Sequence, residues 1–413
     1  MANKNAPQLV APFLAERFSS LERLGRFLSP PYDVINDQRR ATLAAEDHNI
    51  VHLILPEGNG DRYNRAKLLY QEWKREGVIV ADSSPGVYVV RQDFTTPDGK
   101  RHSRTGFIGA LAVEPYSTRR VRRHEETHQG PKQDRLALMR STNAMFEALL
   151  MLSDDEDGQL SGLLSQATSG PRVARAELDG VAISMWHVTG RDAKRIANAA
   201  GNDAVYVADG HHRFETAVAF HKERPVADRT LALIVPTSDP GLVVLPTHRI
   251  IGGGAISEGQ LRLAVGEIYE VVSIDSDSNL NVTMERIHER GGGCVVILPN
   301  NQYFVLTEKT DSTLPRFTPA QDTAIMRLDV ARADTLVIEP LRRVAGSEST
   351  LAYSADVADV KAQVAAGAAA GVLVTPTSLS EVISVADEGG VMPRKSTFFY
   401  PKVPSGLVIL SWR

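Results

Sequence analysis

Cysteine is almost absent from the sequence. Cys294 is the single cysteine among 413 residues, so the chain can form no internal disulfide bond and has no cysteine-rich metal site. It lies in the apolar run from Gly293 to Leu298, which is typical of a strand. We therefore expect a buried, unreactive thiol rather than a nucleophile.

Long hydrophobic runs are also missing. No stretch approaches the ~18 consecutive apolar residues that a membrane-spanning helix needs. The first residues are not followed by the apolar block of a secretory signal. These absences predict a cytoplasmic protein that has no membrane partner.

Two common nucleotide-binding signatures do not occur. There is no G-x-x-x-x-G-K-[ST] loop and no G-x-G-x-x-G after an expected strand, so Walker-type and Rossmann-type sites are not expected. The formal net charge of −4 argues against a surface that engages nucleic acid throughout. No helix-turn-helix pattern follows Arg213, which further disfavours a nucleic-acid partner.

The remaining composition, 43% hydrophobic and 23% charged, is that of a globular protein. At about 150 residues per domain, the length predicts two or three domains. Strand-like and helix-like patterns alternate. Two pairs of apolar runs, 86–93 with 105–113 and 295–298 with 303–307, are joined by turn residues and predict hairpins. The expected fold class is α/β (α+β) with mixed sheets.

Four further expectations concern single elements. Apolar residues at helical spacing, without glycine or proline, predict one helix over 133–152. Residues 242–251 resemble one strand. A strand is expected over 203–208, followed by a turn and a helix over 215–222.

The clearest local signal for a site comes at that turn. An apolar run ends there, and two histidines and an arginine then open the expected helix, in the order Asp209, Gly210, His211, His212, Arg213. A strand–turn–helix junction presents backbone N–H groups and the positive helix end, which suit a phosphate. Imidazole and guanidinium groups would add charge-assisted hydrogen bonds. The alternative is a helix start with solvated polar residues.

A second candidate is the densely charged segment 119–135. Lys132 and Arg135 could face phosphate, with Glu125 as a base or metal ligand. Residues 124–128 match the H-E-x-x-H pattern of zinc peptidases, which works only within a helix. Gly130-Pro131 follows closely and disfavours that helix, so zinc is not the preferred interpretation. A solvated charged loop remains the alternative.

Three shorter segments supply candidate substrate contacts. Pro30 and Pro31 restrict the backbone beside Tyr32 and Asp33, although a rigid turn needs no function. His248 and Arg249 interrupt an apolar strand, where a structural role is the alternative. The last is Lys395, in the basic, aromatic segment 392–407, which could form a substrate wall or belong to the core.

These segments together resemble the bacterial and archaeal proteins of the domain of unknown function 1015 family. The matching pieces are Ser29 to Ile35, Asn49 to Leu53, Arg123 to Glu125 with Gly130 to Arg135, Ala208 to Arg213, Pro246 to Arg249, and Met392 to Lys402. They occur in order over nearly the whole chain. The motifs are specific for membership of the family and say little about its activity.

The turn at residues 209–213 also resembles the phosphate-binding turn of the ParB/sulfiredoxin superfamily, which includes CTP-hydrolysing partition proteins, sulfiredoxins and kinases of free serine. The likeness to the kinases implies that Gly210, His212 and Arg213 would grip nucleotide phosphate and that Glu125 would act on the acceptor hydroxyl. The sulfiredoxin cysteine is replaced by His211, which excludes that chemistry.

The resemblance implies an ATP- or ADP-dependent kinase of free serine or a similar hydroxy amino acid, with Mg²⁺ as cofactor and a nucleotide and a small molecule as partners. A phosphatase or a nucleotide-binding switch is the alternative. It implies a ParB/sulfiredoxin-like core within residues 1–250 and a further α/β domain in 251–413, whose aromatic-basic segment packs back on the core.

Overall fold

The computed structural model describes residues 8–58, 60–127, 129–201, 204–275, 279–289, 292–309 and 324–412. The chain forms two compact units. Unit 1 consists of Met1–Arg123, Thr127–Val243 and Pro401–Arg413, and unit 2 of His124–Glu126 and Val244–Tyr400. The two domains expected from the sequence, with a boundary after residue 250, stay a prediction.

Unit 1 is built on a nine-stranded mixed sheet, in which β1 pairs with β5 beside the order β6-β11-β8-β12-β5-β4-β10-β9. The β11–β6 and β12–β8 pairs are parallel, and the other pairs are antiparallel. The strands are β1 (Val10–Ala11), β4 (Gly86–Thr95), β5 (Arg101–Ala112), β6 (Val121–Arg122), β8 (Leu149–Ser153), β9 (Ala174–Leu178), β10 (Val181–Thr189), β11 (Val205–Asp209) and β12 (Arg229–Pro236).

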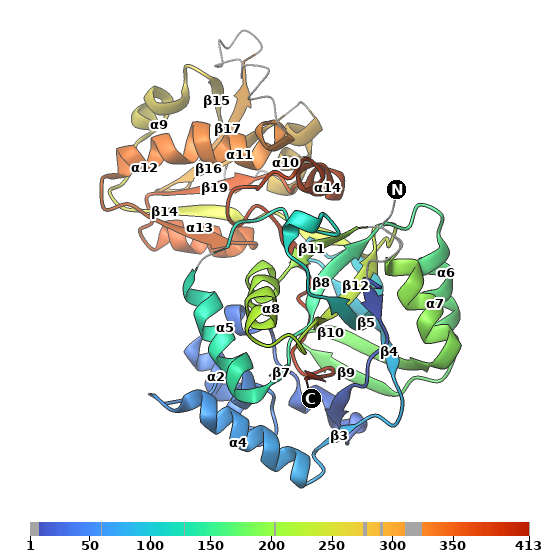
Figure 1. Cartoon of the computed structure of the whole chain (residues 1–413). Coiled ribbons are helices and arrows are strands. Elements are labelled where there is room, and N and C mark those ends of the chain that lie inside the picture. Colours follow the sequence, from blue (N-terminus) through green and yellow to red (C-terminus); the bar gives the residue numbers. More distant parts are fainter. Residues whose placement is uncertain are drawn as a thin grey trace. The chain divides into compact units, whose positions relative to one another are not determined.

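Helices cover this sheet on both sides (Figure 1). On one side α5 packs against α8 and α4, and on the other α6 packs against α7. The helices are α1 (Leu24–Phe27), α2 (Asp37–Ala44), α3 (Val51–Ile54), α4 (Arg62–Arg75), α5 (Gln129–Thr142), α6 (Gln159–Thr168), α7 (Gly190–Gly201) and α8 (His211–Glu223).

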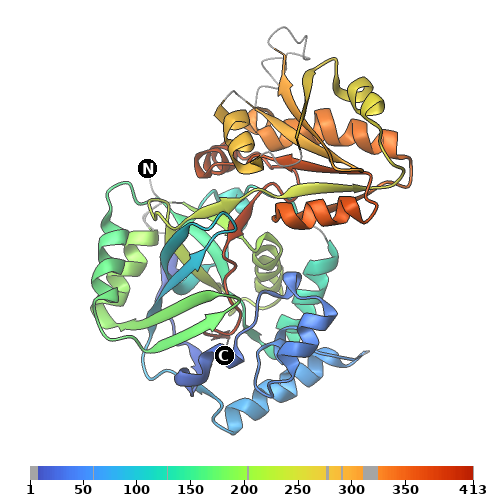
Figure 2. The same ribbon diagram turned by 180° about the vertical axis from the view of Figure 1, so that it is seen from behind.

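Two small sheets complete unit 1: β2 (Glu16–Phe18) with β3 (Ile79–Ala81), and β7 (Ala144–Met145) with β21 (Leu410–Ser411). The second one joins the end of the chain to its middle. Figure 2 shows this C-terminal segment, in dark red, beside the large sheet.

Unit 2 contains a six-stranded sheet with the order β15-β17-β16-β19-β14-β18, in which every pair is antiparallel. Its strands are β14 (His248–Gly252), β15 (Tyr269–Ile274), β16 (Gly293–Leu298), β17 (Gln302–Glu308), β18 (Thr350–Ser354) and β19 (Ala370–Val374), and β13 (Val243–Leu245) pairs separately with β20 (Phe398–Tyr400). Its helices are α9 (Glu258–Val265), α10 (Leu280–Glu289), α11 (Asp329–Ala333), α12 (Glu339–Ala345), α13 (Val357–Ala365) and α14 (Leu379–Glu388).

The fold class expected from the sequence is confirmed, including both hairpins, β4–β5 and β16–β17. In the second hairpin Asn300 and Asn301 adopt φ values of 59° and 60°, as a tight two-residue turn requires. Cys294 is fully buried, and burial raises the pKa of its thiol to about 12. No helix in the described ranges has both the length and the apolar character for crossing a membrane.

The single helix expected over residues 133–152 is wrong. The helix α5 ends at Thr142, Asn143 takes a φ of 53°, and the apolar run that follows becomes the fully buried central strand β8. A short apolar run fits a buried helix or strand equally well, and here its place between β11 and β12 decides. The strand expected over 242–251 is divided into β13 and β14 on the two sides of Pro246.

Candidate functional site

The candidate site begins where β11 leaves the large sheet of unit 1. In β11 four buried residues precede Asp209, and the pairing register with β8 shifts between Val207 and Asp209. Gly210 then takes a φ of 99° and starts α8. A Cβ at that position would lie 2.8 Å from the Cδ2 atom of Leu149 and 3.1 Å from the Nε atom of Arg213. Only glycine suits both the backbone angle and the space.

Asp209 is the charged centre of this turn. Its carboxylate accepts a hydrogen bond of 2.7 Å from Nη2 of Arg213 and one of 2.5 Å from Nζ of Lys402. Burial alone would raise the pKa of Asp209, but the two positive charges outweigh it and the pKa is lowered. Asp209 is therefore ionised over the physiological range and fixes both cations.

Arg213 is buried, with 5% of its surface exposed. Besides the bond to Asp209, it donates from Nη1 to the Ala148 carbonyl over 2.8 Å. The structure thus places this predicted phosphate-gripping residue beside the turn and directs two of its donors to the protein itself. Whether it also contacts a ligand stays a prediction.

The first turn of α8 carries the two histidines. His211 is buried and His212 is half-buried. Because glycine is the N-cap residue, no side chain caps the helix, whose first N–H groups form its positive end. Such an end favours an anion, and His212 is the more accessible of the two imidazoles.

Glu215, which the sequence analysis missed, organises the charged segment before α5. Its carboxylate accepts hydrogen bonds from Arg123 (3.2 Å), Thr127 (2.5 Å) and Lys132 (2.8 Å). Burial acts to raise the pKa of Glu215, but Lys132, Thr127 and Arg123 together lower it. Lys132, expected to face phosphate, is thus tied to α8. No local sequence signal marks Glu215 as its partner.

The Tyr32–Asp33 turn lies within the same electrostatic environment. Arg135 places its Cζ atom 4.1 Å from the centre of the Tyr32 ring, and its Nη1 donates to Glu147 over 3.3 Å. Glu147 also accepts a bond of 3.1 Å from the Tyr32 backbone N–H. Burial first, and then the charge of Asp33, raise the pKa of Tyr32 to about 12, so its hydroxyl stays protonated.

This cluster adjoins the turn at Gly210. Asp209, Glu147, Asp33 and Tyr32 all act to raise the pKa of Arg213 against the effect of burial. A small, partly open cavity of about 20 Å³ is lined by Arg135, Glu147 and Arg213 with five further residues. It has room for a single water molecule. The structure therefore brings the predicted residues Tyr32, Asp33 and Arg135 together with the turn.

Two buried polar residues on the hairpin β4–β5 hold the backbone at Lys402. Arg104, 1% exposed, faces Gln92 across the two strands. Its Nη2 donates to the Gln92 side chain and to the Pro401 carbonyl, each over 2.6 Å, and the Gln92 amide donates to the Lys402 carbonyl over 3.3 Å. The backbone on both sides of the Pro401–Lys402 bond is thereby attached to the sheet.

The other predicted residues belong to unit 2. Glu125 accepts a bond of 3.5 Å from the Lys395 backbone N–H, so these two lie together. His248, 3% exposed, accepts at Nδ1 from the Val374 N–H over 3.3 Å. Burial first, and then the charge of Arg249, lower the pKa of His248 to about 4, so its imidazole is neutral.

Arg249 is fully buried and forms a two-point ion pair with Asp334, with N–O distances of 2.9 and 3.0 Å. A third bond runs from its Nη1 to the Thr247 carbonyl. These contacts give Arg249 a structural role in unit 2. A role of His248 or Arg249 in substrate binding stays a prediction.

The H-E-x-x-H segment offers no zinc site among the residues that can be placed. His128 lies outside the described residues, and Nε2 of His124 is 3.1 Å from the Thr397 hydroxyl. Across the described ranges no group of three or more His, Cys, Asp or Glu side chains could hold a metal ion.

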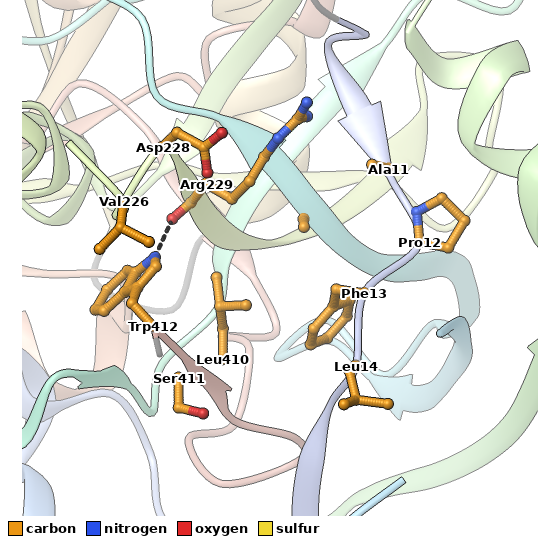
Figure 3. A pocket seen from close by; sticks show the side chains of 11 residues that line it. Ala11, Pro12, Phe13, Leu14, Val226, Asp228, Arg229, Leu410, Ser411 and Trp412 are labelled. Carbon is orange, nitrogen blue, oxygen red and sulfur yellow. Dashed lines mark hydrogen bonds between the residues drawn. The ribbon is translucent and has the colours of Figure 1, made fainter. Parts of the chain in front are cut away.

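A separate open pocket of about 430 Å³ lies on unit 1, between the first and last strands (Figure 3). Phe13 and Leu14 line one side and Val226 and Trp412 the other, and Nε1 of Trp412 donates to the Arg229 carbonyl over 2.9 Å. None of the residues expected at the site lines it.

Comparison with known proteins gives one family and several solved structures. A family model described as "Protein of unknown function (DUF1015)" matches residues 10–331. Comparison with curated proteins gave no match. A variant of free serine kinase in complex with ADP is similar in structure, with 12% identity and a TM-score of 0.37 over 70% of this chain and 90% of the other.

Two further structures are similar to the same degree. A conserved hypothetical protein from Pyrococcus furiosus has 14% identity and a TM-score of 0.35, over 70% of this chain and 93% of the other. SbnI with a C-terminal truncation, from Staphylococcus aureus, has 8% identity and a TM-score of 0.36, over 72% of this chain and 84% of the other.

Proposed function

The chain belongs to the DUF1015 family of proteins of unknown function, and from that premise we propose that it is a small-molecule phosphotransferase. Its reaction would be the ATP- or ADP-dependent phosphorylation of free serine or a similar hydroxy amino acid. The observation that carries the proposal is the turn between β11 and α8. There a glycine with φ of 99°, a helix end without a side-chain cap, and cations fixed by Asp209 meet.

Phosphoryl transfer needs positive groups on the phosphates and a carboxylate near the acceptor hydroxyl. We assign the phosphates to the N–H groups of the first turn of α8 and to His212. The amino-acid acceptor is assigned to the Tyr32–Asp33 turn, where the exposed Asp33 carboxylate could receive an ammonium group. Glu125 is the proposed base.

Mg²⁺ would supply charge neutralisation on the phosphates. It often keeps several waters and needs only one or two protein carboxylates beside the phosphates. Glu147, which lies beside Arg135 and Arg213, is the carboxylate of this cluster that is not assigned to the substrate or to the turn, and it would be the residue to hold Mg²⁺.

A nucleotide-binding switch is the second candidate. It requires only the phosphate turn of unit 1, whereas the kinase also requires Glu125, which belongs to unit 2. With water as the acceptor, the same groups would give a phosphatase instead.

The test is to titrate the full chain with ATP and ADP by calorimetry, and then to assay turnover with Mg²⁺ and a panel of hydroxy amino acids. The kinase proposal expects nucleotide binding and a phosphorylated amino acid. Binding without turnover would favour the switch, and release of phosphate from a phospho-amino acid would favour the phosphatase. No binding of either nucleotide would contradict the kinase and the switch, and no release of phosphate from a phospho-amino acid would contradict the phosphatase.

A further inference from the structure

Lys402 pairs with Asp209 at the turn, although the sequence analysis did not include it among the candidate site residues. We propose that Lys402, and not Arg213, supplies the side-chain cation that contacts the phosphoryl group, so that the last segment of unit 1 contributes to the binding site. This assignment rests on the proposed nucleotide binding at the turn. It changes which part of the chain provides the charge.

The bonding of Arg213 argues against a direct contact. Two of its nitrogens already hold the Ala148 carbonyl and the Asp209 carboxylate, and the side chain is buried. If the guanidinium turned to a ligand, the buried carbonyl would lose this donor and Asp209 would lose one of its two cations. A buried acceptor without a donor is unfavourable, and a ligand would have to offset that loss.

The ammonium of Lys402 differs from this guanidinium in geometry and in exposure. An ammonium carries three N–H donors on a freely turning end, so it can hold a carboxylate and a phosphate oxygen at the same time. Its side chain is 18% exposed, compared with 5% for that of Arg213. Lys402 can therefore meet a ligand while it stays paired with Asp209.

The charges around the turn support the same assignment. Asp209 pairs with two positive groups, Arg213 and Lys402, while Glu147 and Asp33 also act on Arg213. Removal of the Lys402 charge would leave fewer positive charges to offset these carboxylates, so the attraction for a phosphate would weaken.

The backbone of Lys402 is also held in place, by contacts that depend on a buried charge. Arg104 is a buried guanidinium, and burial lowers its pKa to about 10, so it remains charged at neutral pH. Keeping a charge in the interior is unfavourable unless it makes good hydrogen bonds. Here those bonds attach Pro401, and through Gln92 also Lys402, to the hairpin β4–β5. This arrangement positions Lys402 beside the strand end.

The experiment measures the affinity of the full chain for ADP, without Mg²⁺, in Lys402→Met, Lys402→Arg and Asp209→Asn. Lys222→Met is the matched control, because Lys222 is exposed near the other end of the same helix. Loss of a charged hydrogen bond predicts about 10- to 100-fold weaker binding for Lys402→Met. Lys402→Arg should retain most of the affinity, and Asp209→Asn should bind more weakly than the wild type, because the charge that fixes Lys402 is lost.

An unchanged affinity in Lys402→Met, with a wild-type chain that binds ADP, overturns the assignment of Lys402 and leaves the proposed function standing. If the wild-type chain binds no ADP, both are overturned. Should Lys402→Met fail to fold, lysine acetylation of the wild-type chain decides. ADP must then protect Lys402 and leave Lys222 unprotected, and equal reactivity with and without ADP overturns the assignment.

Discussion

Each unit buries an arginine against an aspartate, and both arginines were candidate ligand contacts. In unit 1, Arg213 pairs with Asp209, and in unit 2, Arg249 pairs with Asp334. Both arginines also hold a backbone carbonyl, that of Ala148 or Thr247. The two pairs therefore share these partners, although Arg249 binds its aspartate at two points and Arg213 at one.

The charges around the two ion pairs differ. Burial raises the pKa of Asp334 despite the nearby Arg249, whereas the pKa of Asp209 is lowered, because Lys402 adds a second positive charge that outweighs its burial. A buried ion pair alone is weak evidence for a function. The additional cation beside an uncapped helix end is what makes the turn in unit 1 a candidate for binding an anion.

The largest effect should distinguish the two arginines. Arg249→Met is expected to lower the free energy of unfolding by about 3–5 kcal/mol, since it leaves the Asp334 carboxylate largely buried without this partner. Arg213→Met should lower the free energy of unfolding by less, because Lys402 remains as a positive partner of Asp209. Urea denaturation at neutral pH measures both. Equal losses would contradict the distinction.

The next effect concerns His248 in unit 2. Its pKa is about 4 in the folded chain and about 6.5 when unfolded, so the unfolded state takes up the proton first. The contribution of the neutral His248 to the free energy of unfolding is complete above pH 6.5. This contribution falls by about 2–3 kcal/mol as the pH falls toward 4. Comparison of urea unfolding at pH 7 and pH 4 should show that excess loss for the wild type relative to His248→Asn. If the stability of the wild type and of His248→Asn fell in parallel, the role of His248 in the pH dependence would be refuted.

In unit 1, His212→Ala should weaken ADP binding by about 1.5–3 kcal/mol, the range for a hydrogen bond to a charged group. The control is His288→Ala, because the His288 side chain is 53% exposed in unit 2. Calorimetry on the two variants gives the answer. An affinity that changes equally in both would remove His212 from the site.

The smallest effect tests the turn itself. Gly210→Ala should cost about 1–2 kcal/mol of stability, because of its positive φ and its contact with Leu149. Gly162→Ala, at an open position of α6, should instead be neutral or stabilising. Thermal unfolding of the two variants provides the comparison. A stable Gly210→Ala chain would show that the turn tolerates a side chain.

Local signals predicted much of the fold. The hairpins followed from β-branched runs around turn residues, and the strand–glycine–helix junction at Gly210 followed from the end of an apolar run. The expectation of a helix through Leu149 failed, because the sequence does not say that this run lies between two other strands. Burial on both faces of a sheet is a property of the neighbours.

The partners of the site residues had no such signal. Lys402 and Asp209 are separated by 193 positions, and Glu147 meets Tyr32 across 115. Gln92 and Arg104 face each other if the hairpin has the observed register. Both lie among polar neighbours in the sequence, so no local signal indicates that this contact is buried or that it holds Pro401 and Lys402.

By itself, the sequence determined the family, the α/β class and the place of the turn, because backbone angles, helix starts and hairpins depend on residues a few positions apart. Only the tertiary structure decided which charges are already paired. An arginine and a lysine carry the same charge in the sequence, and whether either can meet a ligand depends on the carboxylates and carbonyls that distant segments bring to it.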